Sequence, residues 1–260
     1  MKVSHEVPFN YLELSLRFND YDYALVHLFD KYPEYVKFFK KSINDGREVI
    51  LDNSAYEISV TPELKEKYPA GYYDMDKYAK WIEEVRPTYY ILPDSKGDVE
   101  KSIELAYKFI NEYPSHGLTI GVVHGNSLEE MKDCYKEMTK IADKIAFSFE
   151  KWQLEGAEST DIPYIRYRTI EKIGIDESIP HHLLGCINPL EFSQFKDCKW
   201  LDSIDTSAPI THALQKETLS VETAYKKPKI TIHDMFEIER ESKYAVMMQY
   251  NARVFKSWLK

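Results

Sequence analysis

Short apolar segments alternate with helical patterns along almost the whole chain. The apolar segments are candidate strands at residues 2–6, 48–53, 88–93, 118–124, 144–149, 180–185 and 200–205. This alternation is typical of parallel strands, because a parallel pair needs a crossover helix between its members. The fold class expected is therefore α/β, a TIM-type (β/α)8 barrel. Seven strands are one too few, and we expect the eighth between residues 206 and 233.

Helical periodicity is clearest behind N-cap residues. An apolar stripe at three- and four-residue spacing runs over 103–110 behind Asp98, and a second begins after Ser127. Further helices are expected over 75–85 and about 234–258. These lengths fit the crossover helices of a barrel and a final helix packed outside it.

We expect one domain over residues 1–260. The chain has only nine glycines, with no Gly/Ser tract and no internal repeat, so nothing in the composition marks a linker. Two stretches interrupt the rhythm, at 7–45 after the first strand and at 151–178 after the fifth. In a barrel, insertions after strands lie on the catalytic face.

Apolar runs and cysteines limit the cellular setting. No run approaches the ~18 residues of a membrane span, and the N-terminus is charged too early for a signal peptide, so we expect a cytoplasmic protein without a membrane partner. Cys134, Cys186 and Cys198 are far apart and form no CxxC pair. This spacing supports neither a disulfide framework nor a structural zinc site.

Polar residues follow several predicted strands directly. Asp52, Asp94, His124 and Asp205 each come after an apolar run. The carboxyl ends of the strands converge on one mouth of a parallel barrel, so these four side chains are expected to share a pocket. Each also has a structural alternative: an Asx-turn at Asp52, a loop cap at Asp94, a core histidine at His124 and a turn cap at Asp205. Their common position favours the functional interpretation.

Carboxylates that face one pocket suit glycosyl transfer, in which one attacks an anomeric carbon and another moves the leaving group's proton. They also suit a divalent metal. Here every acid comes from a different strand with no DxD or HxH spacing, which disfavours a metal site. We expect neither a metal nor another cofactor.

Five motifs resemble those of the tRNA-guanine transglycosylase superfamily, in the family's order. They are ILDNSAYE (50–57), ILPD (91–94), GVVHG (121–125), HLLGC (182–186) with Pro189, and DTSAP (205–209). The resemblance covers roughly residues 48–210 and is closer to the compact phage and bacterial relatives that insert 7-deazaguanines into DNA.

The resemblance implies roles for two catalytic carboxylates. Asp205 would attack the anomeric carbon of a guanosine and displace guanine, leaving a covalent glycosyl ester. Asp52 would be the general acid and base for the leaving and incoming bases.

The resemblance also implies a base-binding set. Asp94 would accept hydrogen bonds from the guanine edge. His124 stands where the family has Gln, which leaves its part in base recognition open and is compatible with a different incoming base. Ser148 and Phe149 lie where the fifth predicted strand offers backbone groups, and Tyr56 would support the pocket or stack on the base.

The sequence departs from the tRNA-acting members in one respect. Nothing after Cys198 can supply their CxCxxC zinc site, which favours DNA as the substrate, with tRNA or a free nucleoside or nucleotide as alternatives. A guanine inside a duplex must be flipped out or the strands opened before its anomeric carbon can be reached. The partners expected are DNA and a 7-deazaguanine base, with a partner protein that delivers the DNA left open.

Charge gives mixed support to a nucleic-acid substrate. Against 34 Lys and Arg stand 43 Asp and Glu, a net charge of −9, which argues against non-specific coating of nucleic acid. Local basic stretches are still candidates for backbone contact: Lys37, Lys40 and Lys41 among aromatics, Arg166 and Arg168 in the second insertion, and Lys226, Lys227 and Lys229. A non-enzyme alternative is a catalytically silent barrel that binds nucleic acid or a protein.

Overall fold

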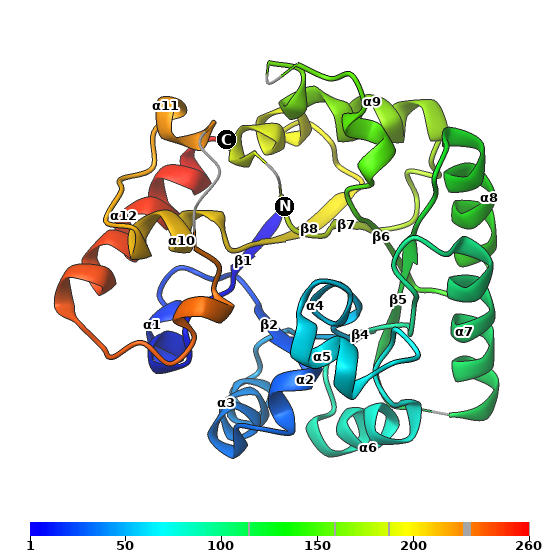
Figure 1. Ribbon diagram of the computed structural model, residues 1–260, viewed down its shortest axis with the longest axis horizontal. Coiled ribbons are helices and arrows are strands. Elements are labelled where there is room, and N and C mark those ends of the chain that lie inside the picture. The colour runs from blue at the N-terminus through cyan, green and yellow to red at the C-terminus, as the bar shows by residue number, and fades with distance from the viewer. Residues whose placement is uncertain (114, 159, 187, 226–229, 260) are drawn as a thin grey trace. The chain divides into compact units, whose positions relative to one another are not determined.

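The computed structural model describes residues 1–113, 115–158, 160–186, 188–225 and 230–259. In these residues eight parallel strands alternate with helices as a TIM-type (β/α)8 barrel, which confirms the predicted fold class (Figure 1). The strands are β1 (Lys2–His5), β2 (Asp22–Leu25), β3 (Val49–Asp52), β4 (Tyr89–Ile91), β5 (Leu118–Val123), β6 (Lys144–Phe147), β7 (His181–Leu183) and β8 (Leu201–Thr206).

Helices follow the strands along the chain. The α-helices are α1 (Leu12–Ser15), α2 (Val26–Phe29), α3 (Pro33–Asn44), α4 (Ala55–Val60), α5 (Pro62–Lys67), α6 (Met75–Val85), α7 (Val99–Glu112), α8 (Leu128–Met138), α9 (Ile162–Ile173), α10 (Ala208–Leu214), α11 (Val221–Ala224) and α12 (Ser242–Ser257). The 3-10 helices are η1 (Phe9–Tyr11), η2 (Lys151–Leu154), η3 (Pro189–Phe195) and η4 (His233–Met235).

The chain divides into two compact units. We call Asp22–Glu150 the central unit and Met1–Tyr21 with Lys151–Lys260 the terminal unit. In the central unit β2 to β6 pair in chain order, all parallel. In the terminal unit β8 pairs in parallel with both β1 and β7.

N-caps begin three helices of the central unit, and two of them, Asp98 and Ser127, are predicted from the sequence. The side chains of Asp74, Asp98 and Ser127 accept the first-turn backbone N–H groups of α6, α7 and α8. Such a cap satisfies a donor that has no partner inside the helix, and it fixes where the helix begins. The predicted apolar stripes coincide with the buried faces of α6 and α8. In α7 the buried residues are Ser102, Leu105, Ala106 and Phe109, so the stripe predicted over 103–110 shares only Ala106 with the buried face.

The eighth strand was predicted in the wrong place. It is β2, inside the stretch 7–45, whereas 206–233 holds α10 and α11. All four residues of β2 are buried, but the strand starts with Asp22, whose carboxylate accepts hydrogen bonds from Ser42 and Arg47. Because α2 follows β2 without a turn, the sequence offers no boundary between strand and helix.

The two predicted insertions are therefore corrected. The stretch 7–45 is two ordinary connections on either side of β2, and 151–178 contains η2 and α9, the helix that follows β6. Each supplies scaffold helices of the fold.

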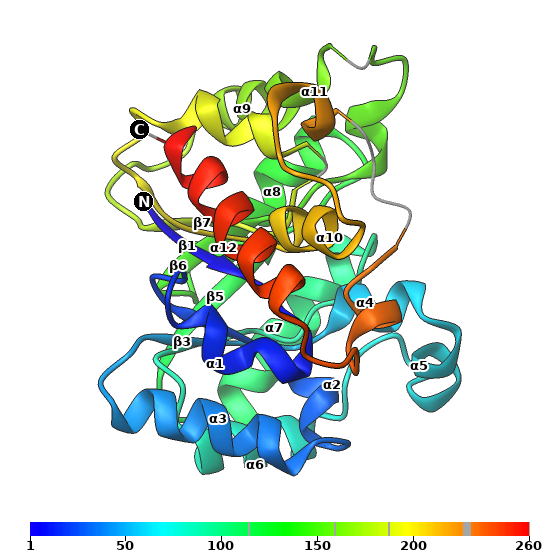
Figure 2. The same cartoon turned by 90° about the vertical axis from the view of Figure 1, so that its left-hand side faces the viewer.

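The last helix, α12, begins later than the sequence predicts, because residues 233–235 form the separate 3-10 turn η4. Tyr244, Met248 and Phe255 are buried, and α12 packs along α10 in the terminal unit (Figure 2). Among the described residues, no helix has both the length and the apolar character that a bilayer span requires.

Candidate active site

Polar side chains of the central unit gather where neighbouring strands end. Asp94 follows β4, His124 follows β5, and Ser148 and Glu150 follow β6. The strands are parallel neighbours, with Ile91 opposite Ile120 and Val123 opposite Phe147, so the residues after them emerge at one edge. We call Asn53, Asp94, Lys96, His124, Ser148 and Glu150 the central cluster.

His124 lies between two carboxylates and is only 1% exposed. Its Nε2 is 2.5 Å from Asp94 Oδ2, and its Nδ1 is 2.9 Å from Glu150 Oε1. Both ring nitrogens can donate to these carboxylates only when the ring is an imidazolium. Burial alone would lower the pKa of His124, but hydrogen bonds and charges from Asp94 and Glu150 outweigh it and raise the pKa to about 9.

Glu150 is itself held in place by His124, Lys96 and Ser148. Burial would raise its pKa, but the hydrogen bond to His124 and the charge of Lys96, whose Nζ is 3.6 Å away, lower it. The Ser148 hydroxyl donates to the same carboxylate at 2.5 Å. Glu150 and Lys96 were not predicted from the sequence, although Glu150 follows a strand just as the predicted residues do.

Asn53 fixes the other side of Asp94. Its Nδ2 donates to Asp94 Oδ1 at 2.6 Å and to Leu92 O at 2.7 Å, while its Oδ1 accepts from Ala55 N at 2.8 Å. Each oxygen of the Asp94 carboxylate therefore receives one hydrogen bond from the cluster and keeps capacity for another.

Asp52 ends β3 and is partly exposed. Its Oδ1 accepts from Ser54 N at 2.5 Å, the Asx-turn of the structural alternative, while its Oδ2 accepts from the Tyr23 hydroxyl at 2.5 Å. The turn holds Ser54 at φ 63°, a left-handed conformation that costs a residue other than glycine about 1 kcal/mol. Asp52 thus has both a turn role and a carboxylate oriented by a phenol.

Asp205 lies in the terminal unit, near the end of β8, and is 4% exposed. Its Oδ1 accepts from His182 Nε2 at 3.0 Å, and Gly185 N–H reaches both oxygens, Oδ1 at 3.1 Å and Oδ2 at 3.2 Å. His182 is fully buried, and its Nδ1 is 2.9 Å from the Ser203 hydroxyl. The chain Ser203–His182–Asp205 fixes the carboxylate, and Oδ2 has fewer of these contacts than Oδ1.

Arg166 does not lie on the surface, so its prediction as a nucleic-acid contact is corrected. The side chain is 1% exposed and pairs with the buried Glu191 at 2.5 Å. Its other donors bind the carbonyls of Leu184 and Gly185. Burial raises the pKa of Glu191 to about 7, more than the nearby Arg166 lowers it.

The lysines of α3 are exposed, but each lies near a carboxylate. Lys37 pairs with Glu34, Lys40 with Glu84 and Lys41 with Asp45. The aromatic residues among them, Tyr35, Phe38 and Phe39, are buried in the core and cannot stack on bases. The pattern of lysines with interleaved aromatics is therefore the two faces of an amphipathic helix.

Two of the remaining predicted contacts are exposed side chains. Tyr56 is 60% exposed on α4, and Arg168 is exposed over the Tyr164 ring at 5.3 Å. The backbone oxygen of Phe149 accepts from Lys96 Nζ at 3.2 Å. Lys226, Lys227 and Lys229 lie outside the described residues.

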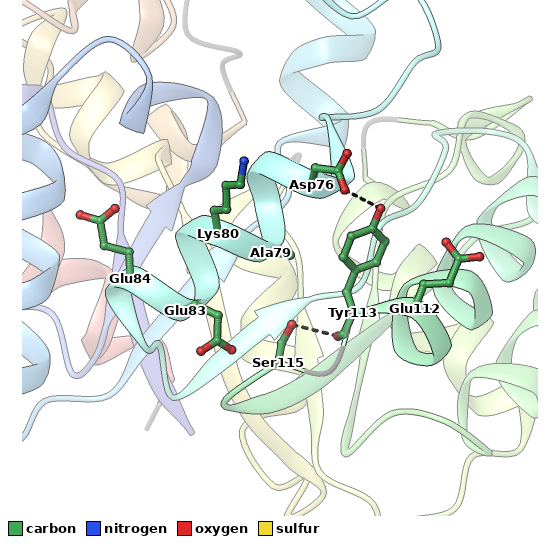
Figure 3. A pocket seen from close by; sticks show the side chains of 8 residues that line it. All are labelled: Asp76, Ala79, Lys80, Glu83, Glu84, Glu112, Tyr113 and Ser115. Carbon is green, nitrogen blue, oxygen red and sulfur yellow. Dashed lines mark hydrogen bonds between the residues drawn. The ribbon is translucent and has the colours of Figure 1, made fainter.

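A surface hollow of about 670 Å³ lies beside α6 and the end of α7 (Figure 3). It is lined by Asp76, Ala79, Lys80, Glu83, Glu84, Glu112, Tyr113 and Ser115. None of these is a candidate residue, so the hollow is separate from the central cluster. In the described part of the chain, no group of three His, Cys, Asp or Glu side chains is arranged to hold a metal ion.

The sequence matches no family model and no curated protein. Among solved structures, N-(5'-phosphoribosyl)anthranilate isomerase from Pyrococcus furiosus is 10% identical with a TM-score of 0.43, covering 95% of this chain and 97% of that one. A designed cube-shaped, porous protein cage is 8% identical with a TM-score of 0.37, covering 91% of this chain and 72% of that one. Similarity at this level does not indicate what this chain does.

Proposed function

We propose that the protein is a transglycosylase that exchanges guanine in DNA for a 7-deazaguanine through a covalent ester on Asp205. The observation that carries the proposal is the setting of the Asp205 carboxylate, which is buried and held by His182 and Gly185 N–H with Oδ2 less engaged than Oδ1. Fixing a nucleophile before the reaction removes the cost of ordering it in the transition state.

The reaction proceeds by two displacements. Asp205 Oδ2 attacks the anomeric carbon, and the bond to guanine N9 breaks as Asp52 protonates the leaving base. The incoming 7-deazaguanine then attacks the same carbon through its ring nitrogen, Asp52 takes the ring proton, and Asp205 is released. Two inversions retain the configuration at the anomeric carbon.

Asp94 recognises the base in this proposal. Its two oxygens are held by Asn53 and His124, and each can accept one of the adjacent N–H groups on the guanine edge. Because both ring nitrogens of His124 bind carboxylates, the ring acts by orienting Asp94, and we revise its role from base contact to support.

A specific observation favours a second candidate, the same exchange on a free nucleoside or nucleotide. The α3 lysines are matched by carboxylates, and the net charge is −9, so this face offers little to a phosphate backbone. Transfer RNA and a silent binding barrel remain outcomes of the test below.

The test is incorporation of radiolabelled guanine into double-stranded DNA, tRNA and mononucleotides. Asp205→Asn should lower the rate about 10⁴-fold or more and abolish the denaturation-stable adduct, because an amide is a far poorer nucleophile. The matched control is Asp202→Asn on the same strand, which is partly exposed and pairs with Lys2. Label that enters DNA alone supports the proposal. Label that enters tRNA or mononucleotides would mean that this molecule is the substrate in place of DNA. If no label enters any of the three, the proposed enzymatic activity is wrong.

A further inference from the structure

A buried ion pair lies behind the loop that holds Asp205. Arg166 comes from α9 and Glu191 from η3, and their side chains are 1% and 0% exposed. Among the described residues, Glu191 Oε2 is buried without a hydrogen-bond partner. Burying two charges costs more than their attraction reliably returns, so a pair of this kind calls for a role beyond stability.

The guanidinium binds the peptide that binds Asp205. Arg166 Nη1 donates to Leu184 O at 2.8 Å, and Nη2 donates to Gly185 O at 2.8 Å. Leu184 C=O and Gly185 N–H belong to one peptide unit, and the described residues contain no cis peptide bond. The N–H therefore points away from the carbonyl, towards the Asp205 carboxylate that it contacts.

The conformation of Gly185 needs this support. Its φ is 55°, in the left-handed region that glycine adopts without a steric penalty but that unrestrained loops leave readily. A planar guanidinium that donates hydrogen bonds to two successive carbonyls fixes the orientation of the peptide between Leu184 and Gly185. A positive charge on the carbonyl also polarises the peptide and makes its N–H a stronger donor.

We propose that Arg166 is a positioning residue that holds the 184–185 peptide so that Gly185 N–H fixes the Asp205 carboxylate for attack. The catalytic part of this inference rests on the proposed function. The structural part does not, because it concerns the coupling between Arg166 and the Gly185 amide.

The first experiment compares Arg166→Lys with Arg253→Lys, an exposed arginine on α12 of the same unit. Lysine keeps the charge but cannot grip two carbonyls. We expect Arg166→Lys to lower kcat for base exchange about tenfold or more with KM within about twofold, because the substrate edge is bound elsewhere. Arg253→Lys should match the wild type. A purely structural role would lower unfolding temperature without this split.

The second readout does not need activity. The Gly185 amide resonance in a nitrogen-15 NMR spectrum should move in Asp205→Asn and in Arg166→Lys, and stay in place in Arg253→Lys. If Arg166→Lys does not fold, the double variant Arg166→Gln with Glu191→Gln leaves no unpaired buried charge and should move the same resonance.

The outcomes separate the two proposals. A Gly185 resonance that moves with Arg166, in a protein without exchange activity, keeps the coupling and overturns the function. A resonance and a kcat that are both unchanged in a folded Arg166→Lys protein overturn the positioning role and leave the function standing.

Discussion

Asp94 and Asp205 are buried to nearly the same degree, 5% and 4% exposed, but they are held by different means. Among the described residues, Asp94 is held by side chains, one of them His124, which Glu150 holds in turn. Asp205 is held by His182 and by a main-chain N–H whose peptide is gripped by Arg166. The orientation of the Asp94 carboxylate is thus fixed by a network of charged side chains, and that of Asp205 by the conformation of a loop.

The two carboxylates should therefore respond to different changes. A charge network responds to pH and to the loss of any ionised member. A loop whose carbonyls are bound by a guanidinium responds to the geometry of those hydrogen bonds. In the proposed function these properties divide base recognition at Asp94 from bond formation at Asp205.

The largest effect that tests this division is expected from Asp94→Asn. The amide presents an N–H to the guanine edge where the carboxylate presents two acceptors, which leaves donors facing each other. We expect kcat/KM for guanine to fall about 100-fold or more, while the adduct on Asp205 still forms at saturating nucleic acid. Steady-state kinetics and intact mass of the denatured protein measure the two effects.

The control for Asp94→Asn is Asp133→Asn, an exposed aspartate on α8. It should match the wild type in both measurements. Loss of the adduct in Asp94→Asn, with no change in guanine preference, would mean that both carboxylates serve bond formation and that the division is wrong.

A smaller and pH-dependent effect is expected from Glu150→Gln. Removing one of the two carboxylates that raise the pKa of His124 should lower it from about 9 by about one unit or more. Loss of the imidazolium weakens the orientation of Asp94, so the alkaline limb of kcat/KM should move to lower pH. Titration of the His124 ring protons by NMR measures the pKa directly.

The sign for stability follows from the raised pKa of His124. In the unfolded chain the pKa of His124 has its ordinary value of 6.5. The stability that protonated His124 contributes to the folded protein is therefore fully present below about pH 6.5 and is lost as pH rises through about 9. It amounts to about 3 kcal/mol, from 2.5 pH units at 1.36 kcal/mol each. Urea unfolding at pH 6 and pH 10 should show a smaller difference in Glu150→Gln than in the exposed control Glu129→Gln.

The two carboxylates also differ in how much of their surroundings could be predicted from the sequence. The position of Asp94 and Asp205 after apolar strands is visible in a linear pattern, and so was the signal for Glu150. The role of Arg166 could not be read from the sequence, because an arginine in a helical stretch is usually exposed. Its partner Glu191 also lies 25 residues away along the chain. Burial of a charge is decided by tertiary contacts.

The same limit explains why β2 was not predicted as a strand. Its four residues carry no alternation that separates them from the aromatic-rich sequence around them, and Asp22 at its start suggests a turn until Arg47 and Ser42 are seen to bind it. Length alone does not explain the difference, because the three-residue strands β4 and β7 lie within predicted segments.

The smallest effect is expected from removing the exposed charges of α3, and it tests whether the comparison of buried carboxylates applies to a polymer substrate at all. In the variant Lys37→Gln, Lys40→Gln, Lys41→Gln, each lost cation was matched by a carboxylate, so exchange should change by less than about twofold. Each phosphate contact in duplex DNA contributes about 0.9 to the slope of log affinity against log salt. A slope that falls by about that amount per lysine would show that α3 lies along the DNA backbone. An unchanged slope, with exchange in mononucleotides, would mean that Asp94 and Asp205 act on a free nucleotide, whose single base needs no extended basic surface to reach them.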